Sequence, residues 1–174
     1  MKRVVVSQPM FLPWVGIFEQ IRAAYIFVHY DDVQFPQGRS FSSRVQLKVE
    51  NGTRWLTVPV RRNVKQAIKD VRIDQSKDWK SSHLGILHHA YRNAQFIDLA
   101  MSLVESIYIY DGDSLSEFCI FGIEKIADFL GLNSKFIRSS SYSFETSSSQ
   151  KLLDIVRVEQ GDSYITGHGA KNYL

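Results

Sequence analysis

The chain has 174 residues, of which 44% are hydrophobic and 22% are charged. This size and composition fit a globular protein with a core of its own, and they exclude a disordered or fibrous chain. No apolar run is long enough to span a membrane or to act as a secretory signal, and the single cysteine, Cys119, excludes an internal disulfide. We therefore expect a cytoplasmic protein.

The net charge of +3 is unevenly distributed along the chain. Residues 36–72 contain nine Lys or Arg side chains and two acidic ones, so this segment carries +7 and the rest carries −4. A concentrated basic segment favours an anionic ligand, such as a phosphate, a nucleotide or a nucleic acid. A solvated basic face without a ligand explains the charges equally well.

The first thirty residues have the pattern of a strand–helix–strand unit. Residues 3–7 and 25–30 predict short strands, and residues 14–24 predict the helix between them. This order indicates parallel strands joined by a right-handed crossover. Ligands bind beyond the carboxyl ends of such strands, where the segments "SQPMFLPWVG" (7–16) and "DDVQF" (31–35) both fall. We therefore expect these two segments to border one concave site.

Both segments contain residue types suited to a site. Asp31 and Asp32 are the candidate catalytic residues, because a carboxylate can act as a general base or hold Mg²⁺; capping of a turn is the alternative. The prolines fix the path of the first loop, and its aromatic rings can form a flat apolar wall or can fill the core beneath the sheet. The candidate substrate-binding residues of the two segments are Gln8, Phe11, Trp14, Gly16 and Gln34.

Asn51-Gly52 between two alternating runs predicts an antiparallel hairpin, an insertion at about residues 41–60. With these two residues as the turn, Lys48 lies opposite Trp55. One face of the hairpin is then apolar and packs on the domain. The other face has two cations, an amide, a hydroxyl and an indole, a platform for a phosphorylated or ring-bearing ligand. The alternative is an exposed polar face with Trp55 covered by a neighbouring segment. The candidate binding residues of this face are Arg44, Lys48, Trp55 and Thr57.

The rest of the chain predicts helices and two more strands. Residues 76–110 are helical in pattern, Ser114 and Glu117 have the spacing of a capping box, and the helix that they open ends at Gly131. A strand at 135–139 ends in serines, and a last short strand leads into a glycine turn. Ser139, Ser140 and Gly167 are further candidate binding residues, with a solvated loop as the alternative for the serines. The histidines at 83, 88 and 89 do not share one helical face, so we expect no metal site.

Several of these motifs together resemble the WbqC-like proteins. "QPMFLPWVGIF", "DDVQF", the strand from Arg44 to Lys48, "NGTRWLTVPV", "SSS" and "YITGHGAKNYL" occur in the order seen in that family. The resemblance extends over nearly the whole chain, so we expect residues 1–174 to form a single WbqC-like domain. Members belong to gene clusters for bacterial O-antigen and other surface polysaccharides, so the resemblance implies a pathway. Members usually continue with a further C-terminal segment, and the resemblance implies that this segment is missing after Leu174.

The first strand, the Phe-x-Pro loop and the glycine at the helix start also resemble the nucleotidyltransferase-like fold. Phe11, Pro13 and Gly16 fall where that superfamily has its phosphate motif, whereas Trp14 and Phe18 lie near the positions of its histidines. We therefore expect an α/β fold with a small, mainly parallel sheet flanked by helices and a protruding hairpin. A nucleotide, with or without Mg²⁺, is the candidate cofactor, and nucleotidyl transfer by the usual route is not expected.

These observations lead to three functional hypotheses. The first is an enzyme that modifies a nucleotide-linked sugar for a surface polysaccharide, by acyl or aminoacyl transfer to an amino group. In this hypothesis the hairpin holds phosphates and Asp31 or Asp32 is the base. The second is a non-catalytic protein that binds a nucleotide sugar or takes part in glycan assembly. The third, a nucleic-acid-binding domain, depends only on the basic segment with Trp55.

Overall fold

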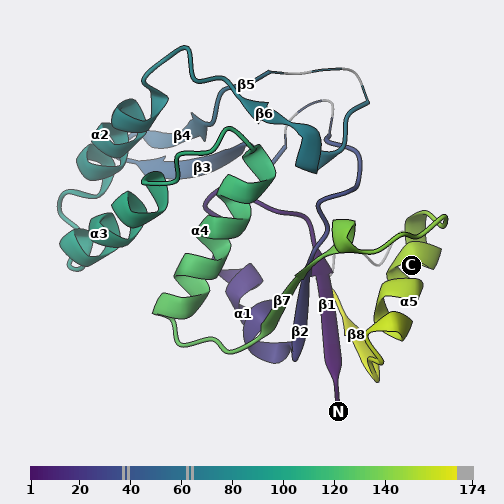
Figure 1. Cartoon of the computed structure of the whole chain (residues 1–174). Helices are drawn as coiled ribbons and strands as arrows, with labels where there is room; N and C mark the ends of the chain where they lie inside the picture. The colour runs from purple at the N-terminus through teal and green to yellow at the C-terminus, as the bar shows by residue number, and fades with distance from the viewer. Residues whose placement is uncertain (37, 39, 62, 64, 168–174) are drawn as a thin grey trace. The chain divides into compact units, whose positions relative to one another are not determined.

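A computed structural model describes residues 1–36, 38, 40–61, 63 and 65–167 of the chain. The chain forms two compact units, which are described separately (Figure 1). The first unit contains residues 1–9, 14–33 and the chain from Ala127 onward, and the second contains residues 10–13 and 34–126. The α/β fold expected from the sequence is confirmed. Within the described residues, no helix has both the length and the apolar character needed to cross a membrane.

The first unit is built on a four-stranded parallel sheet. Its strands lie in the order β7-β2-β1-β8. They are β1 (Arg3–Ser7), β2 (Ile26–His29), β7 (Lys135–Arg138) and β8 (Ser163–Ile165). These positions confirm the strands expected near residues 3–7, 26–30 and 135–139. Because all four strands are parallel, their carboxyl ends lie at one edge of the sheet.

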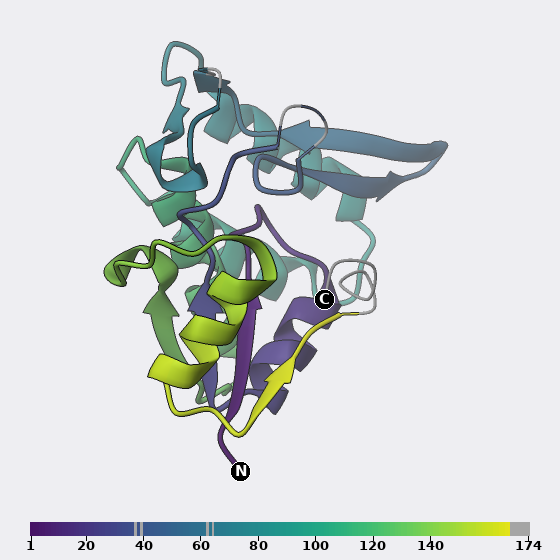
Figure 2. The ribbon, with the colours of Figure 1, turned by 90° about the vertical axis from the view of Figure 1, so that its right-hand side faces the viewer.

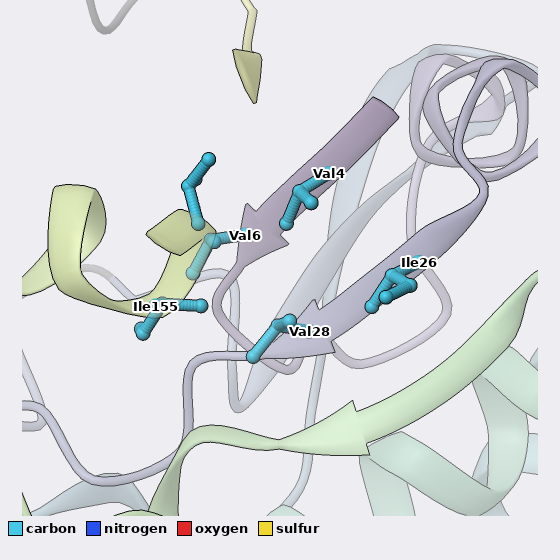
Figure 3. Packing of buried hydrophobic residues seen from close by; sticks show 6 residues of the cluster. Val4, Val6, Ile26, Val28 and Ile155 are labelled. Atoms are coloured by element: carbon cyan, nitrogen blue, oxygen red, sulfur yellow. The ribbon is translucent and has the colours of Figure 1, made fainter. Parts of the chain in front are cut away.

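Helices α1 (Val15–Ala23) and α5 (Ser148–Val158) cover opposite faces of this sheet. The connections from β1 to β2 and from β7 to β8 cross the sheet in opposite directions, and right-handed crossovers then place their helices on opposite sides. Figure 2 shows α5 lying in front of the strands. Strand side chains alternate between the faces, so one set of apolar residues packs on α5 (Figure 3). This cluster contains Val4, Val6, Ile26, Val28, Ile155 and Val156.

The second unit combines a β-hairpin with helices. The hairpin consists of β3 (Arg44–Val49) and β4 (Gly52–Thr57), and a smaller antiparallel pair consists of β5 (Val60–Arg61) and β6 (Arg72–Ile73). The helices are α2 (Trp79–Tyr91), α3 (Ile97–Tyr108) and α4 (Leu115–Phe129), whose last turn belongs to the first unit.

Helix α4 has the ends that its sequence predicts. The backbone N–H of Glu117 donates to Ser114 Oγ at 3.3 Å, as expected at the start of a helix with a serine N-cap. After the last turn, Gly131 takes a positive φ of 68°, and Leu132 N donates to the carbonyl of Ala127 at 2.9 Å. Glycine adopts this left-handed conformation at little cost, so Gly131 ends the helix where the sequence indicates.

The hairpin has a different register from the one expected. Val49 lies opposite Gly52 and Lys48 lies opposite Thr53, so the two turn residues are Glu50 and Asn51. The expected pairing of Lys48 with Trp55 is therefore wrong by two positions. Gly52 has a φ of 118°, which only glycine adopts readily, and it begins β4 instead of closing the turn.

The shift of two positions leaves each side chain on its expected face, because strand side chains alternate with a period of two. Leu47 and Leu56 are buried, as expected for the apolar face. On the polar face, Trp55 lies opposite Gln46, and Thr57 lies opposite Arg44. The register error therefore changes which residues are neighbours on this face without changing its members.

Candidate functional site

Two polar segments meet at the carboxyl edge of the sheet in the first unit. His29 at the end of β2 pairs with Arg138 at the end of β7, so the residues that follow these strands emerge side by side. Asp31 and Asp32 follow β2, and Ser139 and Ser140 lie in a short 3₁₀ turn after β7. The sequence predicted both segments as parts of a site, but did not predict that they bond to each other.

Asp31 is the buried centre of this cluster, with 1% of its surface exposed. Its Oδ1 accepts a hydrogen bond from Ser140 N at 2.9 Å and lies 3.1 Å from Ser139 Oγ, and its Oδ2 accepts from Ser140 Oγ at 2.7 Å. Its backbone N–H donates to Ser139 Oγ at 3.1 Å. A carboxylate with both oxygens bonded and no access to solvent holds its neighbours in place, so the geometry disfavours Asp31 as the base.

Asp32 is the less buried of the two carboxylates. Its Oδ2 accepts a hydrogen bond of 2.6 Å from Nζ of Lys151, in the first turn of α5, and both side chains are mostly buried. Its Oδ1 lies 2.6 Å from Ser139 Oγ. A hydroxyl has one proton to donate, and the distance to Asp32 is shorter than the 3.1 Å to Asp31. Asp32 is therefore the favoured acceptor of the Ser139 proton.

Two opposing effects act on the pKa of the Asp32 carboxyl group. Burial acts to raise it, but the hydrogen bonds from Lys151 and Ser139, together with the charge of Lys151, outweigh burial and lower the pKa below its ordinary value. Asp32 is thus ionised at neutral pH and can accept hydrogen bonds from a ligand. Its lowered pKa also makes it a weaker base than a free carboxylate.

Tyr30 covers the ammonium group of Lys151. Nζ of Lys151 lies 5.4 Å from the centroid of the Tyr30 ring, within the range of a cation–π interaction. Burial, with smaller contributions from the charges of Asp32 and Tyr164, raises the pKa of Tyr30 to about 12. The phenol therefore stays protonated at neutral pH, and Lys151 is held between a carboxylate and an aromatic ring.

The hydroxyls of Ser139 and Ser140 bond to the carboxylates of the cluster, and the burial of Ser139 rules out the solvated loop that was the alternative for this residue. Ser139 is completely buried, and its hydroxyl is engaged by Asp31 and Asp32. The hydroxyl of Ser140 is engaged by Asp31. The serines therefore orient the two carboxylates, because a buried carboxylate requires hydrogen-bond donors that only neighbouring side chains or backbone can supply.

The residues of the first loop, 7–16, differ in how they lie at this edge. Gln8 directly follows β1, so it leaves the sheet at the same edge as Asp32. Trp14 is not a core residue, since 63% of its surface is exposed. Its indole lies against Gly16, where an added Cβ would be 2.0 Å from the ring, so a side chain larger than hydrogen would displace the indole. Gly167 lies after β8, beside Gln20 of α1.

Phe11 does not form an open wall. It belongs to the second unit, is 2% exposed, and lies within 6.0 Å of the Phe118 ring and 5.8 Å of the His83 ring, measured between centroids. The interpretation of Phe11 as a ligand contact is therefore wrong, because this aromatic cluster buries the ring. Gln34 is exposed and forms a backbone bridge with Ala67.

His83 has a structural role within the same cluster. Its Nε2 lies 3.1 Å from the carbonyl oxygen of Thr57, which can only accept, so this nitrogen carries the proton. Its Nδ1, 3.1 Å from the Tyr108 hydroxyl, then accepts. Burial lowers the pKa of His83 to about 4, against a smaller raising effect of the Thr57 carbonyl. Within the described ranges, no group of three or more His, Cys, Asp or Glu could hold a metal ion.

The polar face of the hairpin brings some of its candidate residues together. The guanidinium of Arg44 lies 4.4 Å from the centroid of the Trp55 ring. Lys48 lies nearer the turn, opposite Thr53, because of the observed register. The hydroxyl of Thr53 accepts a hydrogen bond of 2.7 Å from the Gln46 amide. Arg44 and Trp55 therefore form a local pair that does not include Lys48.

The sequence-predicted candidates thus divide between the units. Those of the first unit are Gln8, Trp14, Gly16, Asp31, Asp32, Ser139, Ser140 and Gly167, and those of the second are Phe11, Gln34, Arg44, Lys48, Trp55 and Thr57. Lys151 and Tyr30 were missed. A helix that follows a parallel strand begins at the carboxyl edge, so the position of Lys151 in the first turn of α5 was a usable signal.

Comparison with known proteins shows the family of the chain. Residues 8–174 match the WbqC-like protein family, a range that contains every candidate residue named above. The chain belongs to the WbqC-like family. "Uncharacterized protein Rv1507c" of Mycobacterium tuberculosis (strain ATCC 25618 / H37Rv) is 27% identical to this WbqC-like chain over 177 residues, covering 100% of the chain and 76% of that protein. No solved structure matches the chain significantly.

Proposed function

We propose that this WbqC-like protein is an enzyme of bacterial surface-polysaccharide biosynthesis. In this proposal it transfers an acyl or aminoacyl group to the amino group of a nucleotide-linked sugar. Family membership supports the pathway. The observation that carries the proposal is the cluster of Asp31, Asp32, Ser139, Ser140 and Lys151 at the carboxyl edge of a parallel sheet, because such edges are where ligands bind in α/β proteins.

The chemistry needs a base and an activated acyl donor, such as a thioester. The sugar amine attacks the acyl carbonyl, a C–N bond forms, and the bond from the carbonyl carbon to the leaving group breaks. The proton that the amine loses passes to Asp32 and then to the leaving group. Asp32 is ionised before the reaction, and Lys151 adds positive charge beside it for an anionic part of the substrate. Asp31 is a positioning residue that acts through Ser139 and Ser140.

The test is a transfer assay followed by mass spectrometry. Nucleotide-linked amino sugars are incubated with thioester or aminoacyl donors, and the expected product carries the mass of the acyl group on the sugar. Because general bases contribute about 10²–10⁴-fold, Asp32→Asn should lower the rate by about that factor. Glu19→Gln changes an exposed carboxylate in the same unit and should leave the rate unchanged. Equal rates in the wild type and Asp32→Asn would refute the role of Asp32.

A second candidate is a non-catalytic protein that binds a nucleotide sugar. One observation favours it: both oxygens of Asp31 and the Asp32–Lys151 pair are satisfied within the cluster itself. A cluster that only holds the loops together would also have its polar groups bonded to one another. Binding of a nucleotide sugar without turnover, whichever donor is supplied, would support this candidate.

A further inference from the structure

Phe41, in the turn before β3, and Trp55, on the polar face of the hairpin, form a pair of neighbouring aromatic rings at the surface. The centroids of Phe41 and Trp55 are 6.4 Å apart, and 63% of Phe41 and 36% of Trp55 are exposed. Large aromatic side chains in pairs at the surface leave apolar area in contact with water, which costs free energy. A flat apolar ring from a ligand would cover that area and stack on it.

Arg44 lies beside these rings as a partly buried cation. Its guanidinium stacks on Trp55 at 4.4 Å, which fixes the orientation of its N–H groups. Its Nη2 is buried, so a ligand can reach only the other N–H groups of the guanidinium. Phosphate oxygens match a guanidinium in both charge and geometry.

We propose that this face, formed by Phe41, Arg44 and Trp55, binds a nucleoside diphosphate group. The base stacks on the exposed surface of the Phe41–Trp55 pair, and a phosphate oxygen accepts a hydrogen bond from an accessible N–H group of the Arg44 guanidinium. The proposal goes beyond the proposed function and depends on it only for the choice of a nucleotide over other phosphorylated rings. It also differs from the sequence-based expectation, in which both Arg44 and Lys48 were binding residues.

Lys48 is the natural comparison for Arg44. Both point to the same face of β3, but Lys48 is exposed, lies opposite Thr53, and has Gln46 between it and Arg44 along the strand. A solvated ammonium near the turn attracts an anion weakly, because water and salt screen its charge. Arg54 is exposed on the opposite face of the same hairpin, paired with Leu47. It provides a control with the same charge in the same element.

The experiment is calorimetric titration of the whole protein with four nucleoside diphosphates (UDP, TDP, CDP and GDP), their nucleosides, and inorganic pyrophosphate. We expect at least one nucleoside diphosphate to bind tighter than both its nucleoside and pyrophosphate. Arg44→Ala should weaken the binding of this nucleoside diphosphate at least tenfold. Arg44→Lys should not restore the affinity, because lysine has no planar group to stack on Trp55. Phe41→Ala should weaken the binding of the nucleoside diphosphate several-fold and leave the binding of pyrophosphate unchanged.

Lys48→Ala should lower the affinity for the nucleoside diphosphate less than threefold, and Arg54→Ala should leave this affinity unchanged. Circular dichroism and melting temperature show whether each variant is folded. Equal losses from Arg44→Ala, Lys48→Ala and Arg54→Ala, with a steep salt dependence and tighter binding of single-stranded oligonucleotides, would overturn the proposal in favour of nucleic acid. Unchanged binding in Arg44→Ala would also overturn it.

These binding results are independent of the transfer assay. If no acyl transfer occurs but the pattern of losses holds, the nucleotide site stands and the proposed reaction fails. If transfer occurs and Arg44→Ala and Phe41→Ala bind nucleoside diphosphates like the wild type, the reaction stands and this site is refuted.

Discussion

Lys151 donates a hydrogen bond of 2.6 Å to Asp32, a residue 119 positions earlier in the chain. The pair joins the first turn of α5 to the segment that follows β2, and its side chains are 12% and 14% exposed. Removing one partner of an ion pair with so little water around it is strongly destabilising, because the remaining charge is left buried and unpaired.

The first prediction concerns the stability of this pair. Lys151→Met should lower the free energy of unfolding by about 3 kcal/mol, because it leaves the mostly buried charge of Asp32 without a partner. Adding Asp32→Asn should recover part of this loss, because the uncompensated charge is then removed. Urea unfolding of the two single variants and the double variant gives the coupling energy.

Lys135 supplies the control for that cycle. It lies 3.7 Å from Glu159 and its side chain is 62% exposed, so Lys135→Met should cost less than about 1 kcal/mol. If Lys135→Met and Lys151→Met cost the same, the Asp32–Lys151 pair is no more than a surface ion pair.

The second prediction concerns pH. The pKa of His83 is lowered to about 4 by burial, so between that pH and its ordinary pKa of 6.5 the unfolded state binds a proton that the folded state does not. The contribution of His83 to stability is therefore complete above pH 6.5 and is lost as the pH falls toward 4. Between pH 6.5 and 5 the loss should be about 2 kcal/mol.

Urea unfolding at several pH values measures this loss. His83→Asn should unfold with a shallower pH dependence over this range than the wild type. His88→Asn changes an exposed histidine in the same helix and should keep the full dependence. An identical slope in His83→Asn and the wild type would contradict a neutral, buried His83.

The third prediction compares two glycines that both have open space around them. Gly52 has a φ of 118° at the start of β4, so Gly52→Ala should destabilise the protein by about 1–3 kcal/mol through backbone strain. Gly85 lies inside α2, so Gly85→Ala should stabilise by about 0.5–1 kcal/mol, because alanine favours the helix. Thermal unfolding of both variants checks the opposite signs, and a stabilising Gly52→Ala would contradict the observed turn.

The sequence predicted the framework well because its signals were local. The apolar run of β1, the strand before Asp31 and the Ser114 cap are each readable within a few residues. The hairpin register was not, because the positive φ of Gly52 can serve either inside a two-residue turn or at the first position of a strand. The two registers bury the same face, with Leu47 and Leu56 on it, so the alternation of apolar and polar residues does not distinguish them.

The candidate site was predictable in its location but not in its bonding. The carboxyl-edge rule located Asp31, Asp32 and the serines. It could not show that the hydroxyl of Ser139 lies within hydrogen-bond distance of both carboxylates, because that depends on the side-chain directions of two loops more than a hundred residues apart in sequence. Phe11 was misjudged for a related reason: an aromatic loop residue looks the same in sequence whether it lines a pocket or fills a core.

We propose that the Asp32–Lys151 cluster contacts the sugar of a nucleotide-linked amino sugar. Calorimetric titration with such a compound and with its nucleotide alone tests this directly. The wild type should bind the sugar-linked compound at least tenfold tighter, since a charge-assisted hydrogen bond contributes about 1.5–3 kcal/mol. In the Asp32→Asn/Lys151→Met variant, which leaves no buried unpaired charge, the two ligands should bind equally. A tenfold preference that survives in this variant would show that the cluster does not contact the sugar.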